Sequence, residues 1–226
     1  MLDATDRLIE RLVESARPVR RLRAPMVRAT LWLSAVAAFG AVAILAFSNV
    51  AVFAQRASNP KLEVELGGTL LTGIAAVVAA FHLSLPDRSP RWALLPLPSL
   101  ALWIASSGYS CYRHWVSFGP DGWEIGESAL CFRFILAVGI PLGVSLLLLL
   151  RRSRPLSPPR VAAVGGLGVA ALAAFILQFF HPFDVTFMDL SVHLVAIGIV
   201  VALSALAGGF ARHDGRVRPD GSLQAP

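Results

Sequence analysis

The sequence has few charged residues and few cysteines. Only 15% of its 226 residues are charged, whereas 56% are hydrophobic, and the mean hydropathy is +0.67. This composition excludes a disordered chain, a coiled coil and an ordinary soluble globular domain. Two cysteines are too few for a small secreted domain held by disulfides, and no set of ligands has the spacing of a zinc finger.

Known catalytic motifs are also missing from the chain. It has no phosphate-binding loop, no Gly-x-Ser-x-Gly turn and no His-Glu-x-x-His motif. We therefore expect no enzymatic activity and no required cofactor. Proton-coupled transporters need an ionisable residue near the middle of a span, and the apolar runs of this chain carry no carboxylate or arginine there. A small permease or channel is therefore only the second hypothesis for its function.

The apolar residues fall into long runs without charge. Six stretches of 17 or more residues contain no charged side chain. The hydrocarbon core of a bilayer is about 30 Å thick and requires roughly 20 apolar residues in a helix. The sequence therefore predicts an all-α polytopic membrane protein, a bundle of six transmembrane helices with a short amphipathic helix before it. The predicted spans are residues 30–54, 66–85, 92–109, 130–150, 161–180 and 189–210.

The basic residues predict how the chain is oriented. With six spans both termini lie on one side, and 16 of the 20 lysines and arginines lie in the segments on that side. Because cytoplasmic loops carry an excess of these residues, we expect both termini in the cytoplasm. Residues 1–29 then form a cytoplasmic leader, residues 30–210 the bundle, and residues 211–226 a disordered tail. Since most arginines adjoin apolar spans, they indicate orientation rather than binding of nucleic acid.

The leader contains a predicted helix with one apolar face. Leu8 and Leu12, together with Ile9 and Val13, recur at i and i+4. Pro18 prevents the helix from continuing. A helix of about 13 residues is marginal alone in water, so this face must rest on lipid, on the bundle or on another protein. The pattern leaves two hypotheses open, a lipid anchor and a partner-binding helix.

An arginine-rich stretch follows the predicted helix. Between Arg17 and Pro25 the chain carries four arginines within seven positions, namely Arg17, Arg20, Arg21 and Arg23. Taken alone, this stretch favours an orientation signal for the first span over a binding site.

Several short motifs are spread over nearly the whole chain. They are Asp6-Arg-Leu-Ile-Glu-Arg-Leu, Arg17-Pro-Val-Arg-Arg-Leu, Cys131 at the start of the fourth span with Pro141 inside it, Arg151-Arg-Ser-Arg-Pro-Leu-Ser-Pro, the glycine-rich start of the fifth span and Phe180-His-Pro-Phe-Asp. This set resembles the NrsF-like family of bacterial polytopic anti-sigma factors. The resemblance implies an inner-membrane protein whose leader keeps an extracytoplasmic-function sigma factor inactive until an envelope-side signal releases it. The partner-binding residues are then expected to be Leu8, Ile9, Leu12, Val13, Pro18, Arg20 and Arg21.

The predicted topology also brings potential metal ligands to the outer ends of the spans. They are Cys111, Cys131, His181, Asp189 and His193, with His114 and Asp184 in adjoining loops. Thiolate and imidazole together suit zinc, cadmium or copper(I), and a thiolate is also open to oxidation. Taken alone, these residues favour packing and interfacial roles over a functional site. Cys111 and Cys131 could instead form a disulfide if their Cα atoms lie within about 7 Å.

The family resemblance implies two cysteines that sense metal or oxidative stress. The first matches Cys131, whereas the second falls where this chain has His181, and Cys111 lies outside the family pattern. This departure leaves three hypotheses, which are a Cys–His metal site, a dithiol that uses Cys111, and loss of sensing. The candidate sensor residues, for a transient thiophilic metal or a redox change, are Cys131, His181, Cys111, His193 and Asp184.

Overall fold

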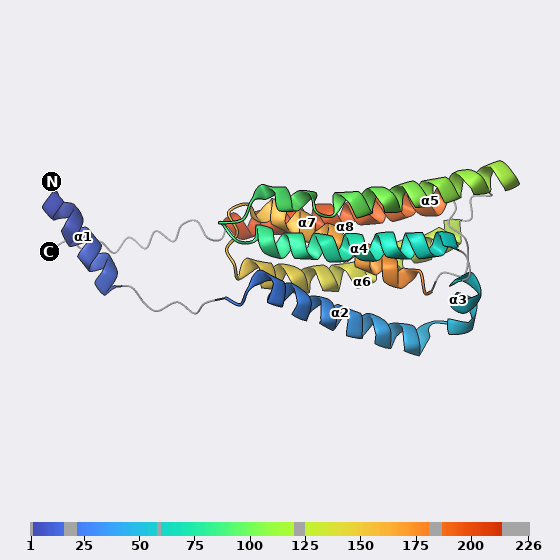
Figure 1. Cartoon of the computed structure of the whole chain (residues 1–226), viewed down its shortest axis with the longest axis horizontal. Coiled ribbons are helices and arrows are strands. Elements are labelled where there is room, and N and C mark those ends of the chain that lie inside the picture. Colours follow the sequence, from blue (N-terminus) through green and yellow to red (C-terminus); the bar gives the residue numbers. More distant parts are fainter. Residues whose placement is uncertain (1, 16–21, 58–59, 120–124, 181–186, 214–226) are drawn as a thin grey trace.

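The computed structural model describes residues 2–15, 22–57, 60–119, 125–180 and 187–213, and every regular element in this part is a helix (Figure 1). In chain order the elements are α1 (Leu2–Glu14), α2 (Pro25–Phe47), α3 (Val50–Ala57), α4 (Pro60–Leu83), the 3₁₀ helix η1 (Pro90–Leu94), α5 (Leu97–Phe118), α6 (Ile125–Arg151), α7 (Pro158–Leu177) and α8 (Phe187–His213). The predicted all-α class is confirmed for the described residues.

Five of the described helices are long and apolar enough to cross a membrane, in agreement with the predicted class of protein. They are α2, α4, α7 and the segments Ala129–Arg151 of α6 and Leu190–Phe210 of α8. The predicted span at 92–109 is the exception, because it is divided between η1 and α5 around Pro96. From its middle onward, α5 also carries Ser106, Ser107, Ser110 and Arg113, which lower its hydropathy. Composition therefore supports five candidate spans where the sequence predicted six.

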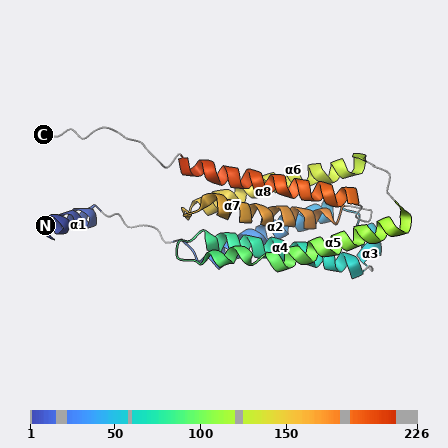
Figure 2. The ribbon, with the colours of Figure 1, turned by 90° about the horizontal axis from the view of Figure 1, so that it is seen from above.

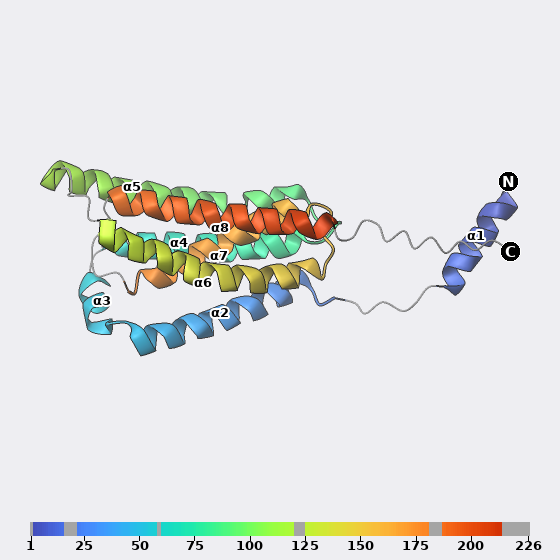
Figure 3. The ribbon, with the colours of Figure 1, turned by 180° about the vertical axis from the view of Figure 1, so that it is seen from behind.

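The first predicted span, residues 30–54, is not one helix. α2 ends at Phe47 because Ser48 adopts an extended backbone conformation, with φ −90° and ψ 154°. The Ser48 amide donates to the Ile44 carbonyl at 2.9 Å, and the Ser48 hydroxyl donates to the same carbonyl at 2.7 Å. The short α3 begins at Val50 and crosses the end of the bundle (Figures 1 and 3). The candidate span, Pro25–Phe47, is therefore shorter than the predicted one and begins earlier.

The core of the bundle is built around α7. This helix packs against α4, α6 and α8, and Figure 2 shows it between α4 and α8. Most of its residues are buried, and glycines bring the backbones together. A Cβ atom on Gly168 would lie 2.8 Å from Cγ2 and 3.0 Å from the backbone nitrogen of Val77 on α4. Small residues at helix interfaces permit such close approach in membrane proteins.

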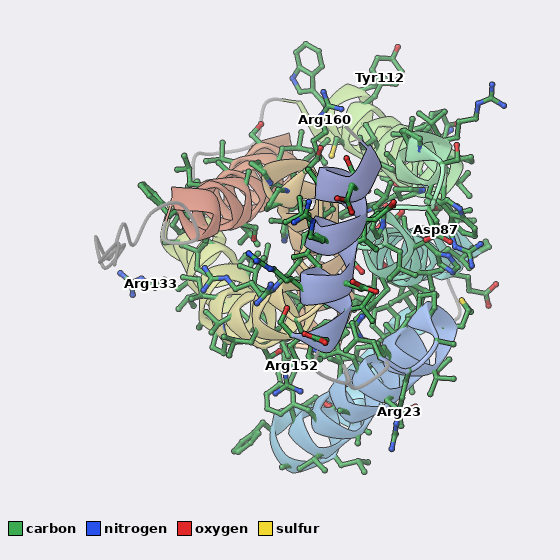
Figure 4. All side chains as sticks on the ribbon, turned by 90° about the vertical axis from the view of Figure 1, so that its left-hand side faces the viewer. Arg23, Asp87, Tyr112, Arg133, Arg152 and Arg160 are labelled. Carbon is green, nitrogen blue, oxygen red and sulfur yellow. The ribbon has the colours of Figure 1, made fainter. Side chains whose placement is uncertain are left out.

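The two ends of the bundle carry different elements. The starts of α2 and α7 and the ends of α4, α6 and α8 lie at one end, whereas α3 and the end of α5 lie at the other (Figures 1 and 3). Following the predicted topology, we name these the inner end and the outer end. The inner end holds the arginine-rich connections, and Figure 4 views the molecule from this side with Arg23, Arg152 and Arg160 labelled.

At the inner end, η1 is held against the end of α4 by an aromatic stack. The rings of His82 and Trp92 are nearly parallel, with centroids 3.9 Å apart and an angle of 6° between their planes. The Ser89 hydroxyl accepts a hydrogen bond from the Arg91 amide at 3.3 Å, which starts η1. This packing fixes the connection between α4 and α5.

Candidate functional sites

α1 is shaped by short-range contacts within the leader. Arg7 donates to the Asp3 carboxylate at 2.7 Å and, through Nε, to the Asp3 carbonyl at 3.1 Å. At the other end the Ser15 amide donates to the Arg11 carbonyl at 3.0 Å. Because an exposed ion pair on a helix contributes only about 0.3–0.5 kcal/mol, these contacts alone give a marginal helix. Its stability depends on what covers its apolar face.

The apolar face of α1 is exposed in the structure. Leu8 is 57% exposed, Ile9 53%, Leu12 60% and Val13 68%. Figures 1 and 2 show α1 apart from the bundle. Burying one such side chain typically contributes about 1.5–3 kcal/mol. The predicted apolar stripe therefore lies on α1, and its four side chains are exposed like the rest of this helix.

The polar face of α1 is acidic. Asp6, Glu10 and Glu14 follow one another at i and i+4 and form a ridge along the helix, with Asp3 near its start. Against these four carboxylates α1 carries two arginines, Arg7 and Arg11. Helices that lie on membranes are usually rich in lysine and arginine on the polar face, since these residues attract anionic lipids. The charge of α1 therefore favours a protein partner over a lipid anchor.

The other predicted partner-binding residues, Pro18, Arg20 and Arg21, lie outside the described residues. Arg23, the last arginine of this stretch, is described and exposed. Of the predicted partner-binding residues, the structure therefore describes the four apolar residues of α1.

At the outer end, Cys131 lies where three helices meet. Its side chain is 3% exposed and packs in a cluster with Ile135 of α6, Ala173 and Leu177 of α7, and Ala196 of α8. Phe134, one turn further along α6, packs against Phe180 with ring centroids 5.3 Å apart. Phe180 is the last described residue before His181. The structure therefore brings the chain on the N-terminal side of His181 close to the Cys131 cluster.

Of the remaining predicted sensor residues, the structure describes Cys111 and His193. Cys111 is buried on α5, which packs against α4 and α8, and it is not a member of the Cys131 cluster. His193 is half-buried on α8, and His181 and Asp184 lie outside the described residues. Among the described residues, no three His, Cys, Asp or Glu side chains form a group that could hold a metal ion.

Glu65 is a buried residue that the sequence analysis missed. It is 5% exposed and lies on α4, one residue before the predicted start of the second span. The buried stripe of α4 includes Leu62, Glu65, Thr69, Thr72 and Ala76, which recur every three or four residues. This spacing was a visible signal, because a helix extended backwards from residue 66 places Glu65 on its inward face. The Thr69 and Thr72 hydroxyls donate to carbonyls of their own helix.

Arg28 at the inner end was also missed. The prediction assigned it to the leader as an orientation charge, but the structure places it in the first turn of α2. Its guanidinium donates to the Ser153 hydroxyl at 2.6 Å and to the Leu149 carbonyl, and it stands 5.1 Å from the ring centroid of Phe81. One side chain of α2 therefore contacts both α4 and the end of α6. No local pattern in the sequence indicates these partners.

A family model matches most of the chain. The matching model is NrsF, described as negative regulator of sigma F, and it covers residues 12–211. The match begins within α1 at Leu12 and ends within α8, so it includes Cys131 and the arginine-rich stretches. No curated protein and no solved structure matches the chain.

Proposed function

Because the chain belongs to the NrsF family of negative regulators of sigma F, we propose that it is a membrane-bound anti-sigma factor that sequesters an extracytoplasmic-function sigma factor through its leader. The observation that carries this proposal is the exposed apolar face of α1, formed by Leu8, Ile9, Leu12 and Val13. Burial of four such side chains supplies enough free energy for a specific complex. The acidic ridge on the same helix argues against a lipid anchor.

We further propose that the protein crosses the inner membrane six times, with both termini in the cytoplasm. In this arrangement α5 is the remaining crossing. Its 22 residues extend over about 33 Å, which is sufficient for a bilayer core. α5 packs against α4 and α8 along the bundle. These two helices provide a protein surface next to α5, so its serines need not all face lipid. The Ser106 hydroxyl already donates to the Trp103 carbonyl at 2.9 Å.

Release of the sigma factor is proposed to start at Cys131. A buried thiol that binds a thiophilic metal or becomes oxidised needs more space than the closely packed cluster offers. The start of α6 would then shift against α7 and α8. His181 is the proposed second ligand in a Cys–His metal site, and Cys111 is the proposed second thiol if the signal is oxidation.

Repression of sigma-dependent transcription tests this proposal. The double variant Leu8→Asp, Leu12→Asp introduces two charges into the apolar face, so we expect binding to weaken at least about a hundredfold and repression to be lost. The matched control is Arg7→Gln, Arg11→Gln, which changes the net charge of α1 by the same two units on its polar face. If the Leu8, Leu12 variant still represses at normal membrane abundance, α1 is not the inhibitory segment.

A further inference from the structure

Arg28 is a charged residue inside a candidate membrane span. It lies in the first turn of α2 and is partly buried. Ionisable side chains in such segments are costly and usually mark a function that is identified by their partner. The polar partners of Arg28 are the Ser153 hydroxyl, at 2.6 Å, and the Leu149 carbonyl. Both belong to the inner end of α6 and the turn that follows it.

The positive charge of Arg28 matches the partial negative charge at the C-terminal end of α6. The last carbonyls of a helix have no partner within the helix, and they carry a partial negative charge. The Arg28 guanidinium donates to one of them, Leu149, and thereby caps α6 from a neighbouring helix. Next to Ser153, Arg154 has φ +47°, a conformation that costs a residue with a Cβ atom about 1–2 kcal/mol. The turn that receives Arg28 is therefore held in a constrained conformation.

Apart from this contact, α2 packs mainly against α4. Only one narrow stripe of α2 is buried, formed by Ala29, Trp32, Val36 and Gly40. The Trp32 indole donates to the Ser145 hydroxyl of α6 at 3.1 Å. The remaining apolar surface of α2 is largely exposed, and Figures 1 and 3 show the helix at the edge of the bundle beside α6. Arg28 and Trp32 are thus the polar links between α2 and α6 in the described part of the chain.

We propose that the Arg28 contact, formed by Arg28 with Ser153 and Leu149, is the link through which α6 positions α2 and the leader. This inference rests on the proposed function. Cys131 lies near the outer end of α6 and Leu149 near its inner end, so one helix connects the sensor to this contact. Helix shifts in allosteric proteins are about 1–2 Å. A shift of this size is enough to lengthen the 2.6 Å bond from Arg28 to Ser153 beyond about 3.2 Å, where such bonds weaken.

In the structure the Arg28 contact is formed and the apolar face of α1 is exposed. We assign this arrangement to the repressing state. Breaking the contact should release the sigma factor without inducer. The test compares full-length Arg28→Lys and Ser153→Ala in membranes. Lysine keeps the charge for orientation but cannot make the forked contact. Arg160→Lys is the matched control, because Arg160 is an exposed arginine at the same end of the bundle.

We expect uninduced sigma-dependent transcription to rise at least about fivefold in Arg28→Lys and in Ser153→Ala. A fivefold change is the lower end of the usual coupling between distant sites. In Arg160→Lys, transcription should stay at the parent level. If Arg28→Lys is less abundant in the membrane than the parent, Ser153→Ala decides, because it removes one acceptor and no charge. Parent-like repression in both variants, with release in Leu8→Asp, Leu12→Asp, would overturn the Arg28 proposal and leave the proposed function standing. Full repression in the Leu8, Leu12 variant as well would instead reject the proposed function, and the Arg28 proposal with it.

Discussion

At the scale of single residues, Cys131 places a thiol in a closely packed position. Its thiol lies among Ile135, Leu177 and Ala196, so it links α6 to α7 and α8. Protein interiors have few voids larger than a water molecule. A ligand or oxygen atom added to this sulfur therefore has to displace a neighbouring helix. This is how a chemical event at one atom would become a movement of α6.

Replacement of Cys131 by serine tests its role as the sensor. Serine keeps the approximate size but removes the soft ligand. We expect Cys131→Ser to repress normally without inducer and to release the sigma factor poorly in the presence of cadmium or an oxidant. The measurement is sigma-dependent transcription as a function of inducer concentration.

Two further variants distinguish a metal site from a disulfide. Loss of response in Cys131→Ser and His181→Ala, with a normal response in Cys111→Ser, would indicate a metal site. Equal loss in both cysteine variants, with a change of electrophoretic mobility on reduction, would indicate a disulfide. If all three variants respond like the parent, Cys131 is a packing residue and the signal enters elsewhere.

Residues whose roles depend on distant partners could not be predicted from the sequence. The Arg28 contact joins residues more than 120 positions apart, and no local pattern encodes such a pair. Glu65 differs, because its place on the three- and four-residue stripe of α4 was visible and was missed only because the predicted span began at residue 66. Cys131 was placed correctly near the start of a helix, but its partners follow from tertiary packing.

At the scale of elements, prediction succeeded where local sequence determines the structure. The apolar stripe of α1 follows from i and i+4 spacing, and α4, α6, α7 and α8 follow from uncharged runs. The break between α2 and α3 was missed because apolar residues continue on both sides of Ser48. Hydropathy reports burial in lipid and does not report where a backbone leaves the helical conformation.

The packing of α7 against α4 gives a prediction for bundle stability. In Gly168→Ala the new Cβ atom would lie 2.8 Å from a Val77 methyl group and 3.0 Å from the Val77 backbone nitrogen. Because that nitrogen cannot rotate away, we expect a loss of about 1–3 kcal/mol. The control is Gly198→Ala on α8, where a Cβ atom meets nothing within 4 Å. Thermal unfolding in detergent should separate the two variants, and equal midpoints would contradict the packing described here.

At the scale of the whole molecule, the orientation of the chain determines whether the leader can meet a cytoplasmic protein. Reporter fusions after Ala29 and after Phe210 should be cytoplasmic, whereas a fusion at Gly119, directly after α5, should be periplasmic. The Gly119 fusion tests whether α5 crosses the membrane. Fusions after Ala29 and Phe210 on opposite sides would show an odd number of crossings and reject the proposed topology.

Helices α4 and α7 are packed too closely to line, between them, the pathway of the alternative small permease or channel. A Cβ atom on Gly73 would lie 2.7 Å from Cγ of Leu172, so these two helices leave no space for a pathway there. The buried Thr69 and Thr72 hydroxyls donate to carbonyls of α4. Transport would also leave the exposed apolar face of α1 without an explanation.

Affinity capture of the full-length chain from gently solubilised bacterial membranes tests the central claim most directly. The account predicts that a sigma factor co-purifies with the parent protein and with Arg7→Gln, Arg11→Gln, and that it is lost from Leu8→Asp, Leu12→Asp. The two double variants change the net charge of α1 equally, but only Leu8→Asp, Leu12→Asp alters its exposed apolar face. Parent protein captured at normal abundance without any sigma factor would contradict the account.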